Sequence, residues 1–316
     1  MKIRLIKLKT KKILLKTIPI WIAIILILES SVLIGIIEYY ILKKNFDNSV
    51  VQLAKTTESP EELIQVLKQE VIPQKGYVLA VKWNDVGKLL LSSGAIDKEK
   101  FEELFKDNKA GLKNMWHLEN TSKDNMVIDE DSSHFMVNTL WALGLVNKSK
   151  ILDEGSMTKY DKGDVMNFAS TGGWSLGAKP TTELYSSTKV VELSEDQEAL
   201  VEKIARSIYR PCCDNHTEFP DCNHGMAALG YIQLAVKQGV SEKRIYKDIL
   251  ALNSFWFPQN YVELAAYFQK QNKEWKNVDP KLALSETYSS AQGMQKIKEE
   301  VQNIPGVGSS GGGCGA

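Results

Sequence analysis

Residues 212–224 read CCDNHTEFPDCNH, and they separate two segments whose apolar residues recur at helical spacing. Three of the four cysteines and two of the four histidines of the chain lie in this short stretch. Thiols and imidazoles are the ligands that transition metals prefer, and thiols are also redox-active. The stretch therefore locates the chemistry of the protein, although it does not identify a substrate.

Both flanking segments carry helix signals. Residues 194–197, SEDQ, form a capping box, and an apolar stripe follows from Leu200 to Tyr209. A second helix is expected over 223–236, with Gly239 after its end. If the two helices pack as a hairpin, the loop between them folds back and brings its cysteines and histidines together.

Cys222 stands where the second helix is expected to begin. The unpaired N–H groups of a helix N-terminus carry partial positive charge, which stabilises a thiolate. We therefore expect Cys222 to be the thiol with the lowered pKa, and a lowered pKa favours both metal ligation and nucleophilic attack.

The favoured hypothesis is a site for a soft transition metal, zinc or copper, which binds sulfur and nitrogen ligands. The candidate ligands in the loop are Cys212, Cys213, His216, Cys222 and His224. Cys314, on a glycine-rich tail, is a further, mobile candidate. The predicted function is binding or transfer of the metal. The sequence leaves open whether the protein is also an enzyme.

Two alternatives use the same residues. In the first, Cys212, Cys213 and Cys222 are the redox residues of a thiol–disulfide oxidoreductase. In the second, one disulfide merely staples the loop of a structural anchored protein. The spacing of the cysteines is compatible with all three hypotheses.

The predicted fold class is mainly α, with an N-terminal transmembrane helix, an irregular α+β middle region and a C-terminal helical bundle that holds the Cys/His loop in a helical hairpin. Within the middle region we expect a strand over 77–83, a buried helix over 134–145, and a glycine-rich turn over 170–177 that packs Trp174 onto the core. The expected segments are a basic cytoplasmic stretch (1–16), a transmembrane signal anchor (17–42), a helical stalk (45–75), the mixed irregular region (76–192), a helical Cys/His domain (193–303) and a flexible tail (304–316).

Charge divides the chain unevenly. Nine of the 39 basic residues and two of the 39 acidic residues lie in the first 44, so the remainder carries 30 basic and 37 acidic side chains, a net charge of −7. An acidic body argues against a nucleic-acid partner. The lysine-rich start and the apolar run over 17–42 predict a single-pass protein of the cell membrane, with the lipid bilayer as partner, the N-terminus cytoplasmic and the body extracytoplasmic. Another metal- or thiol-handling membrane protein is a further expected partner.

Two resemblances concern the same region. IYRPCC (208–213) followed by FPDCNHGM (219–226) is similar to an uncharacterised family of bacterial membrane-anchored proteins. In layout, residues 204–257 resemble the helical hairpin of the cytochrome c maturation protein H family, whose members are membrane-anchored and handle thiols for haem attachment. Two adjacent cysteines stand here where that family has C-x-x-C. The second resemblance implies thiol chemistry outside the cytoplasm, and it relates the thiol–disulfide oxidoreductase hypothesis to cytochrome c maturation.

Overall fold

The computed structural model describes residues 34–41, 60–160, 164–305 and 307. The chain divides into two units, residues 1–51 and 52–316. In the first unit the described part is a helix over residues 34–41, whose large apolar side chains are exposed. In the second unit the elements are α2 (Pro60–Val71), β1 (Tyr77–Asn84), α3 (Val86–Ser93), α4 (Lys98–Leu104), α5 (Lys109–Glu119), β2 (Ser122–Ile128), α6 (Ser133–Val146), α7 (Lys150–Glu154), α8 (Ser156–Lys159), η2 (Val165–Asn167), α9 (Thr181–Leu184), α10 (Glu195–Ala205), α11 (Asn223–Lys237), α12 (Glu242–Trp256), α13 (Pro258–Lys270), η3 (Trp275–Asn277), α14 (Pro280–Ala283), α15 (Glu286–Ser289) and α16 (Ala291–Val301).

Helices α6 and α11 form the centre of the second unit. Every residue of α6 from Phe135 to Val146 is buried, and so is every residue of α11 from His224 to Val236. The two helices touch backbone to backbone: a Cβ on Gly144 would lie 2.1 Å from the Met226 carbonyl oxygen. Glycine is therefore required at this crossing, and burial of each large apolar side chain around it contributes about 1.5–3 kcal/mol.

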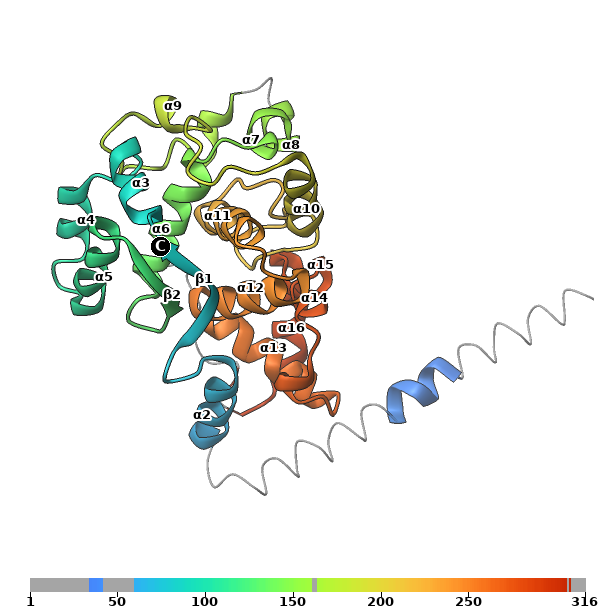
Figure 1. Cartoon of the computed structure of the whole chain (residues 1–316). Helices are drawn as coiled ribbons and strands as arrows, with labels where there is room; N and C mark the ends of the chain where they lie inside the picture. The colour runs from blue at the N-terminus through green and yellow to red at the C-terminus, as the bar shows by residue number, and fades with distance from the viewer. Residues whose placement is uncertain (1–33, 42–59, 161–163, 306, 308–316) are drawn as a thin grey trace, which may run out of the picture. The chain divides into compact units, whose positions relative to one another are not determined.

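The remaining elements surround this pair (Figure 1). Helices α3, α4 and α5 lie with the two strands on one side, and α12 to α16 lie on the other. The strands pair antiparallel, with Tyr77 opposite Ile128, and they alternate so that Leu79, Val81 and Trp83 are buried. The core is thus one continuous helical packing with a small sheet at its edge.

Buried Asp248 on α12 ties strand β1 to the helices. Its carboxylate accepts hydrogen bonds from the Tyr77 hydroxyl (2.7 Å), the Ala80 N–H (2.9 Å) and Arg244 Nε (2.7 Å), and also from the Tyr231 hydroxyl of α11. A buried carboxylate is tolerated because every one of these donors points at it. The edge of β1 is thereby joined to the helical core.

Local sequence signals placed many elements correctly. The capping box at Ser194 and Gln197 is present and begins α10, and Ser290 caps α16 through the N–H of Gly293. The expected strand over 77–83 and the expected buried helix over 134–145 are confirmed as β1 and α6. The glycine-rich stretch is a turn that buries Trp174, whose Nε1 donates to the Ala95 carbonyl (2.9 Å).

The predicted fold class requires correction. In the part of the chain that the structure describes, no helix has both the length and the apolar character needed to cross a membrane. The described helix within the predicted anchor covers residues 34–41 only, about 12 Å at 1.5 Å per residue, and residues 17–33 and 42 lie outside the described part. The middle region supplies α6, which packs against α11 of the C-terminal region.

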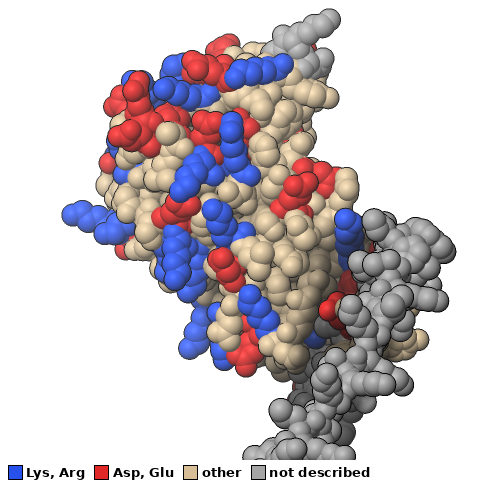
Figure 2. Space-filling view, turned by 90° about the vertical axis from the view of Figure 1, so that its right-hand side faces the viewer, with Lys and Arg blue, Asp and Glu red and all other residues tan. Residues whose placement is uncertain are grey.

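Basic and acidic side chains alternate on the surface in Figure 2, with neither sign dominating the face shown. Several of them pair, such as Lys203 with Glu242 at 2.7 Å and Lys270 with Glu300 at 2.8 Å. Exposed pairs of this kind contribute about 0–1 kcal/mol each, so the fold depends chiefly on its buried contacts.

Candidate functional site

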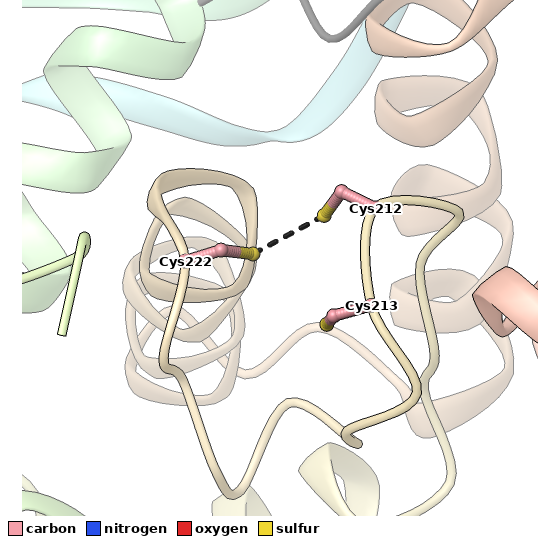
Figure 3. Close-up of side chains that lie close together, drawn as sticks. All are labelled: Cys212, Cys213 and Cys222. Carbon is pink, nitrogen blue, oxygen red and sulfur yellow. Dashed lines mark hydrogen bonds between the residues drawn. The ribbon is translucent and has the colours of Figure 1, made fainter.

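The loop between α10 and α11 gathers three sulfur atoms. Cys222 projects from the start of α11 and faces Cys212 and Cys213, which lie on the loop opposite (Figure 3). The Sγ atoms of Cys212 and Cys222 are 3.2 Å apart, and the three sulfurs lie within 4.8 Å of one another. All three are free thiols and are partly exposed. A group of this shape can hold a metal ion.

Arg210 organises this loop. Its side chain is 1% exposed, and its guanidinium donates from Nε to Cys222 Sγ (3.0 Å) and from Nη2 to Asp221 Oδ1 (2.5 Å). It also donates to the carbonyl oxygens of Asn215 (2.9 Å) and Phe219 (3.2 Å). One buried cation therefore fixes both the course of the loop and the position of the Cys222 sulfur.

The first turn of α11 contributes to this arrangement through Cys222 and Gly225. Cys222 is the N-cap residue, and its Sγ accepts the Gly225 N–H at 3.3 Å. A Cβ on Gly225 would lie 2.5 Å from Arg210 Cζ, so glycine lets the guanidinium lie against the helix. A cation beside the positive end of a helix is unfavourable unless an anion lies between them, and the Cys222 sulfur occupies that place.

The pKa of the Cys222 thiol is lowered well below its ordinary value, as the sequence predicted. The main causes are hydrogen bonds from the Cys212 and Cys213 thiols, and the positive charge and Nε–H of Arg210 add to them against the opposing effect of burial. The helix N-terminus was the only cause foreseen, whereas the neighbouring thiols and Arg210 contribute directly. Cys222 is the thiolate of the group.

The other two cysteines keep their protons. The pKa of Cys212 is raised by its hydrogen bonds with Cys213 and Cys222 and by burial. The hydrogen bond from Cys212 lowers the pKa of Cys213, but the hydrogen bond with Cys222 and burial outweigh it and raise the pKa to about 12. Within the group, therefore, Cys222 is the most acidic of the three thiols.

His224 lies outside the sulfur group. It is 1% exposed, and its ring packs against Phe257 and Trp256 with centroid separations of 4.4 and 5.6 Å. Neither ring nitrogen has a hydrogen-bond partner among the residues that the structure describes. Burial lowers the pKa of this imidazole to about 4, so the ring is neutral near neutral pH.

His216 also stays apart from the sulfurs. Its ring stands edge-on to Tyr209, and its Nδ1 lies 3.7 Å from Glu218 Oε2. Glu218 is buried and accepts hydrogen bonds from the backbone N–H and the hydroxyl of Ser156. Cys314, the mobile candidate, lies outside the described residues. The structure therefore brings together Cys212, Cys213 and Cys222 and leaves both nearby imidazoles outside their group.

Sequence reasoning missed the role of Arg210. Its place two residues before the cysteine pair was visible, but its burial and its contact with Cys222 depend on how the loop folds back. The loop is further held by the glycine-rich turn, since the Ser170 N–H donates to the Asp221 carbonyl (3.1 Å). An arginine close to clustered cysteines in sequence is the one signal that pointed to it.

No family model, no curated protein and no solved structure matches this chain. Its function must accordingly be inferred from the chemistry of the three sulfurs and the groups around them.

Proposed function

We propose that this protein binds a soft transition metal ion, zinc or copper, through Cys212, Cys213 and Cys222. The observation that carries the proposal is the approach of three sulfurs to within 4.8 Å of one another. A zinc–sulfur bond of about 2.3 Å places tetrahedral sulfur ligands about 3.8 Å apart. Shifts of an ångström or less therefore suffice to fit the group around an ion.

The surroundings of the sulfurs favour a cation ligated by thiolates. Metal binding requires that each coordinating thiol lose its proton, and the lowered pKa of Cys222 favours this loss. Arg210 offsets the negative charge that the thiolates accumulate, which lowers the cost of burying them. The three cysteines are neither fully buried nor fully exposed, and a site of this kind near the surface suits transfer of the ion to a partner.

Metal analysis of the full chain, purified under reducing conditions, tests the proposal. The wild-type protein is expected to carry an equimolar amount of zinc or copper, and Cys222→Ser is expected to lose it. Asp214→Asn is the matched control. Asp214 is an exposed residue of the same loop, and its carboxylate accepts hydrogen bonds from the backbone N–H and the side-chain amide of Gln292. A wild-type protein that takes up no ion when either metal is supplied refutes the proposal.

A second function, thiol–disulfide exchange, is favoured by the close Cys212–Cys222 pair. The Cys222 thiolate would attack a disulfide of a substrate protein and form a mixed disulfide, and one substrate sulfur would leave as a thiolate. Cys212, on losing its proton to solvent, would then attack Cys222 Sγ, releasing the second substrate thiolate. The substrate is reduced, and the Cys212–Cys222 pair is oxidised to a disulfide.

The two functions give opposite results in the same preparation. Thiol–disulfide exchange predicts a metal-free protein whose Cys212–Cys222 disulfide is readily reduced by a dithiol and reformed by a disulfide substrate. Metal binding predicts that bound ion protects the same cysteines from alkylation and oxidation, and that a chelator removes this protection.

A further inference from the structure

We infer that His224 supplies the fourth ligand of the metal site, so that the ion is zinc held by three cysteines and one histidine. This inference rests on the proposed metal-binding function and adds to it the identity of both the fourth ligand and the ion. It requires the imidazole to turn out of its aromatic surroundings toward the sulfurs when the ion arrives.

The unpaired state of His224 is the first reason. Its side chain is 1% exposed, and both Nδ1 and Nε2 are buried without a hydrogen-bond partner in the described part of the chain. Buried polar atoms almost always find partners, because leaving them unpaired costs free energy. The ring packs against Trp256 and Phe257, and the Nε1 of Trp256, which is also buried without a partner among the described residues, makes no hydrogen bond to it. Ligation of a metal would satisfy one nitrogen and expose the other.

Proximity along the chain is the second reason. His224 follows Cys222 by two residues in the first turn of α11, so their Cα atoms are at most about 7 Å apart. Rotation about the side-chain bonds of a histidine moves its ring nitrogens by several ångströms. Residues two apart in a helix do not face each other, so the imidazole has to turn about these bonds to approach the sulfur group.

Charge is the third reason, and it separates zinc from copper. Three thiolates around Zn²⁺ leave one net negative charge, whereas three thiolates around Cu⁺ leave two. Arg210 contributes one positive charge, but it is shared with the Asp221 carboxylate. A neutral imidazole completes the zinc site without adding charge, while a fourth thiolate would add another uncompensated negative charge to a largely buried loop.

His216 provides the matched control. It belongs to the same loop, and its Nδ1 is also buried without a hydrogen-bond partner in the part of the chain that the structure describes, but that atom lies 3.7 Å from Glu218 Oε2 and the side chain is 33% exposed, whereas His224 is 1% exposed. Phenylalanine at either position keeps an aromatic ring and removes the ligand nitrogens.

The experiment uses the full chain, reduced and metal-free, with Co²⁺ as the spectroscopic probe and Zn²⁺ as competitor. Wild type and His216→Phe are expected to give the intense visible bands of four-coordinate cobalt and the same zinc affinity within about twofold. His224→Phe is expected to weaken zinc binding by about 100-fold or more, at the upper end of what removing a supporting group costs. It should also shift the cobalt bands.

A rescue experiment guards against a mere folding defect. In His224→Ala, added imidazole is expected to restore the wild-type cobalt spectrum, because the small ligand can enter the vacated space. Unchanged zinc affinity in His224→Phe overturns the inference. If Cys314→Ser loses zinc affinity while His224→Phe keeps it, the tail thiol is the fourth ligand and the inference is likewise wrong. If wild type binds neither ion, the proposed metal-binding function is wrong as well. If zinc binds equally well to wild type and to His224→Phe, only the inference about His224 is wrong.

Discussion

Replacing Arg210 by methionine removes the cation around which the cysteine loop is built. Methionine retains much of the length and volume of the side chain but none of its donors. The change strips hydrogen bonds from Cys222 Sγ, Asp221 Oδ1 and two backbone carbonyls, and it leaves the Cys222 thiolate and the Asp221 carboxylate facing each other without a counter-charge.

The expected loss in the free energy of unfolding is about 3–5 kcal/mol, the usual cost of removing one partner of a buried ion pair. No discount for solvent screening applies, because the Arg210 side chain is 1% exposed. The individual hydrogen bonds, at about 1.5–3 kcal/mol each for charged groups, are not summed, since they share one donor group and are not additive.

The loss should depend on pH with a definite sign. Because the pKa of Cys222 is lowered in the folded protein, its contribution to stability is complete above the unfolded thiol value of about 8.5 and is lost as the pH falls toward the folded value. Without Arg210 the pKa of Cys222 is lowered less. The difference in unfolding free energy between wild type and Arg210→Met should therefore shrink as the pH falls below about 8.5.

Urea denaturation of the two reduced, metal-free proteins across this pH range measures the difference, and the ultraviolet absorbance of the thiolate reports the Cys222 pKa directly. Arg206→Met is the matched control, since Arg206 is 59% exposed and its pair with Glu202 is worth about 0.5 kcal/mol or less. Equal stability of Arg210→Met and wild type at high pH, or an unchanged thiolate titration, would refute the role given to Arg210.

Three further predictions concern the core and the thiols. Asp248→Asn should lower the free energy of unfolding by about 3 kcal/mol in urea denaturation, because the amide cannot accept all the donors that face the carboxylate; a change below about 1 kcal/mol would contradict this. Gly144→Ala should lower it by about 1–3 kcal/mol or more, since the new Cβ would lie 2.1 Å from a backbone oxygen of α11, and unaltered stability would show that the two helices are not in such close contact. Mild oxidation of the metal-free protein should form a disulfide between Cys212 and Cys222, which peptide mapping detects. A disulfide that involves Cys213 would contradict the 3.2 Å separation of the Cys212 and Cys222 Sγ atoms.

Local signals were sufficient for many helices. The capping box at Ser194, the proline at position 258 and the serine cap of α16 each begin a helix through hydrogen bonds or dihedral preferences within a few residues. Such interactions are present in the sequence itself, so reading them requires no knowledge of the fold. The same holds for the N-cap position of Cys222, from which its lowered pKa was expected.

Long-range contacts could not be predicted in this way. Nothing near Gly144 in sequence indicates that its backbone meets Met226, and nothing near Tyr77 indicates that its hydroxyl reaches Asp248. The predicted transmembrane helix is a separate case: hydropathy over 17–42 indicated a span, but no helix in the described part of the chain is long and apolar enough to cross a membrane.

The sequence by itself determined where the reactive side chains gather, because three cysteines within eleven residues cannot lie far apart. Only the tertiary structure decided that all three form one group, that Arg210 lies against it, and that His216 and His224 stand outside it. The physical reason is that the burial of a side chain and the charges near it depend on residues that are distant in the sequence. The pKa of Cys222 depends on a guanidinium and two thiols whose positions are set by the packing of α11 and the fold of its loop.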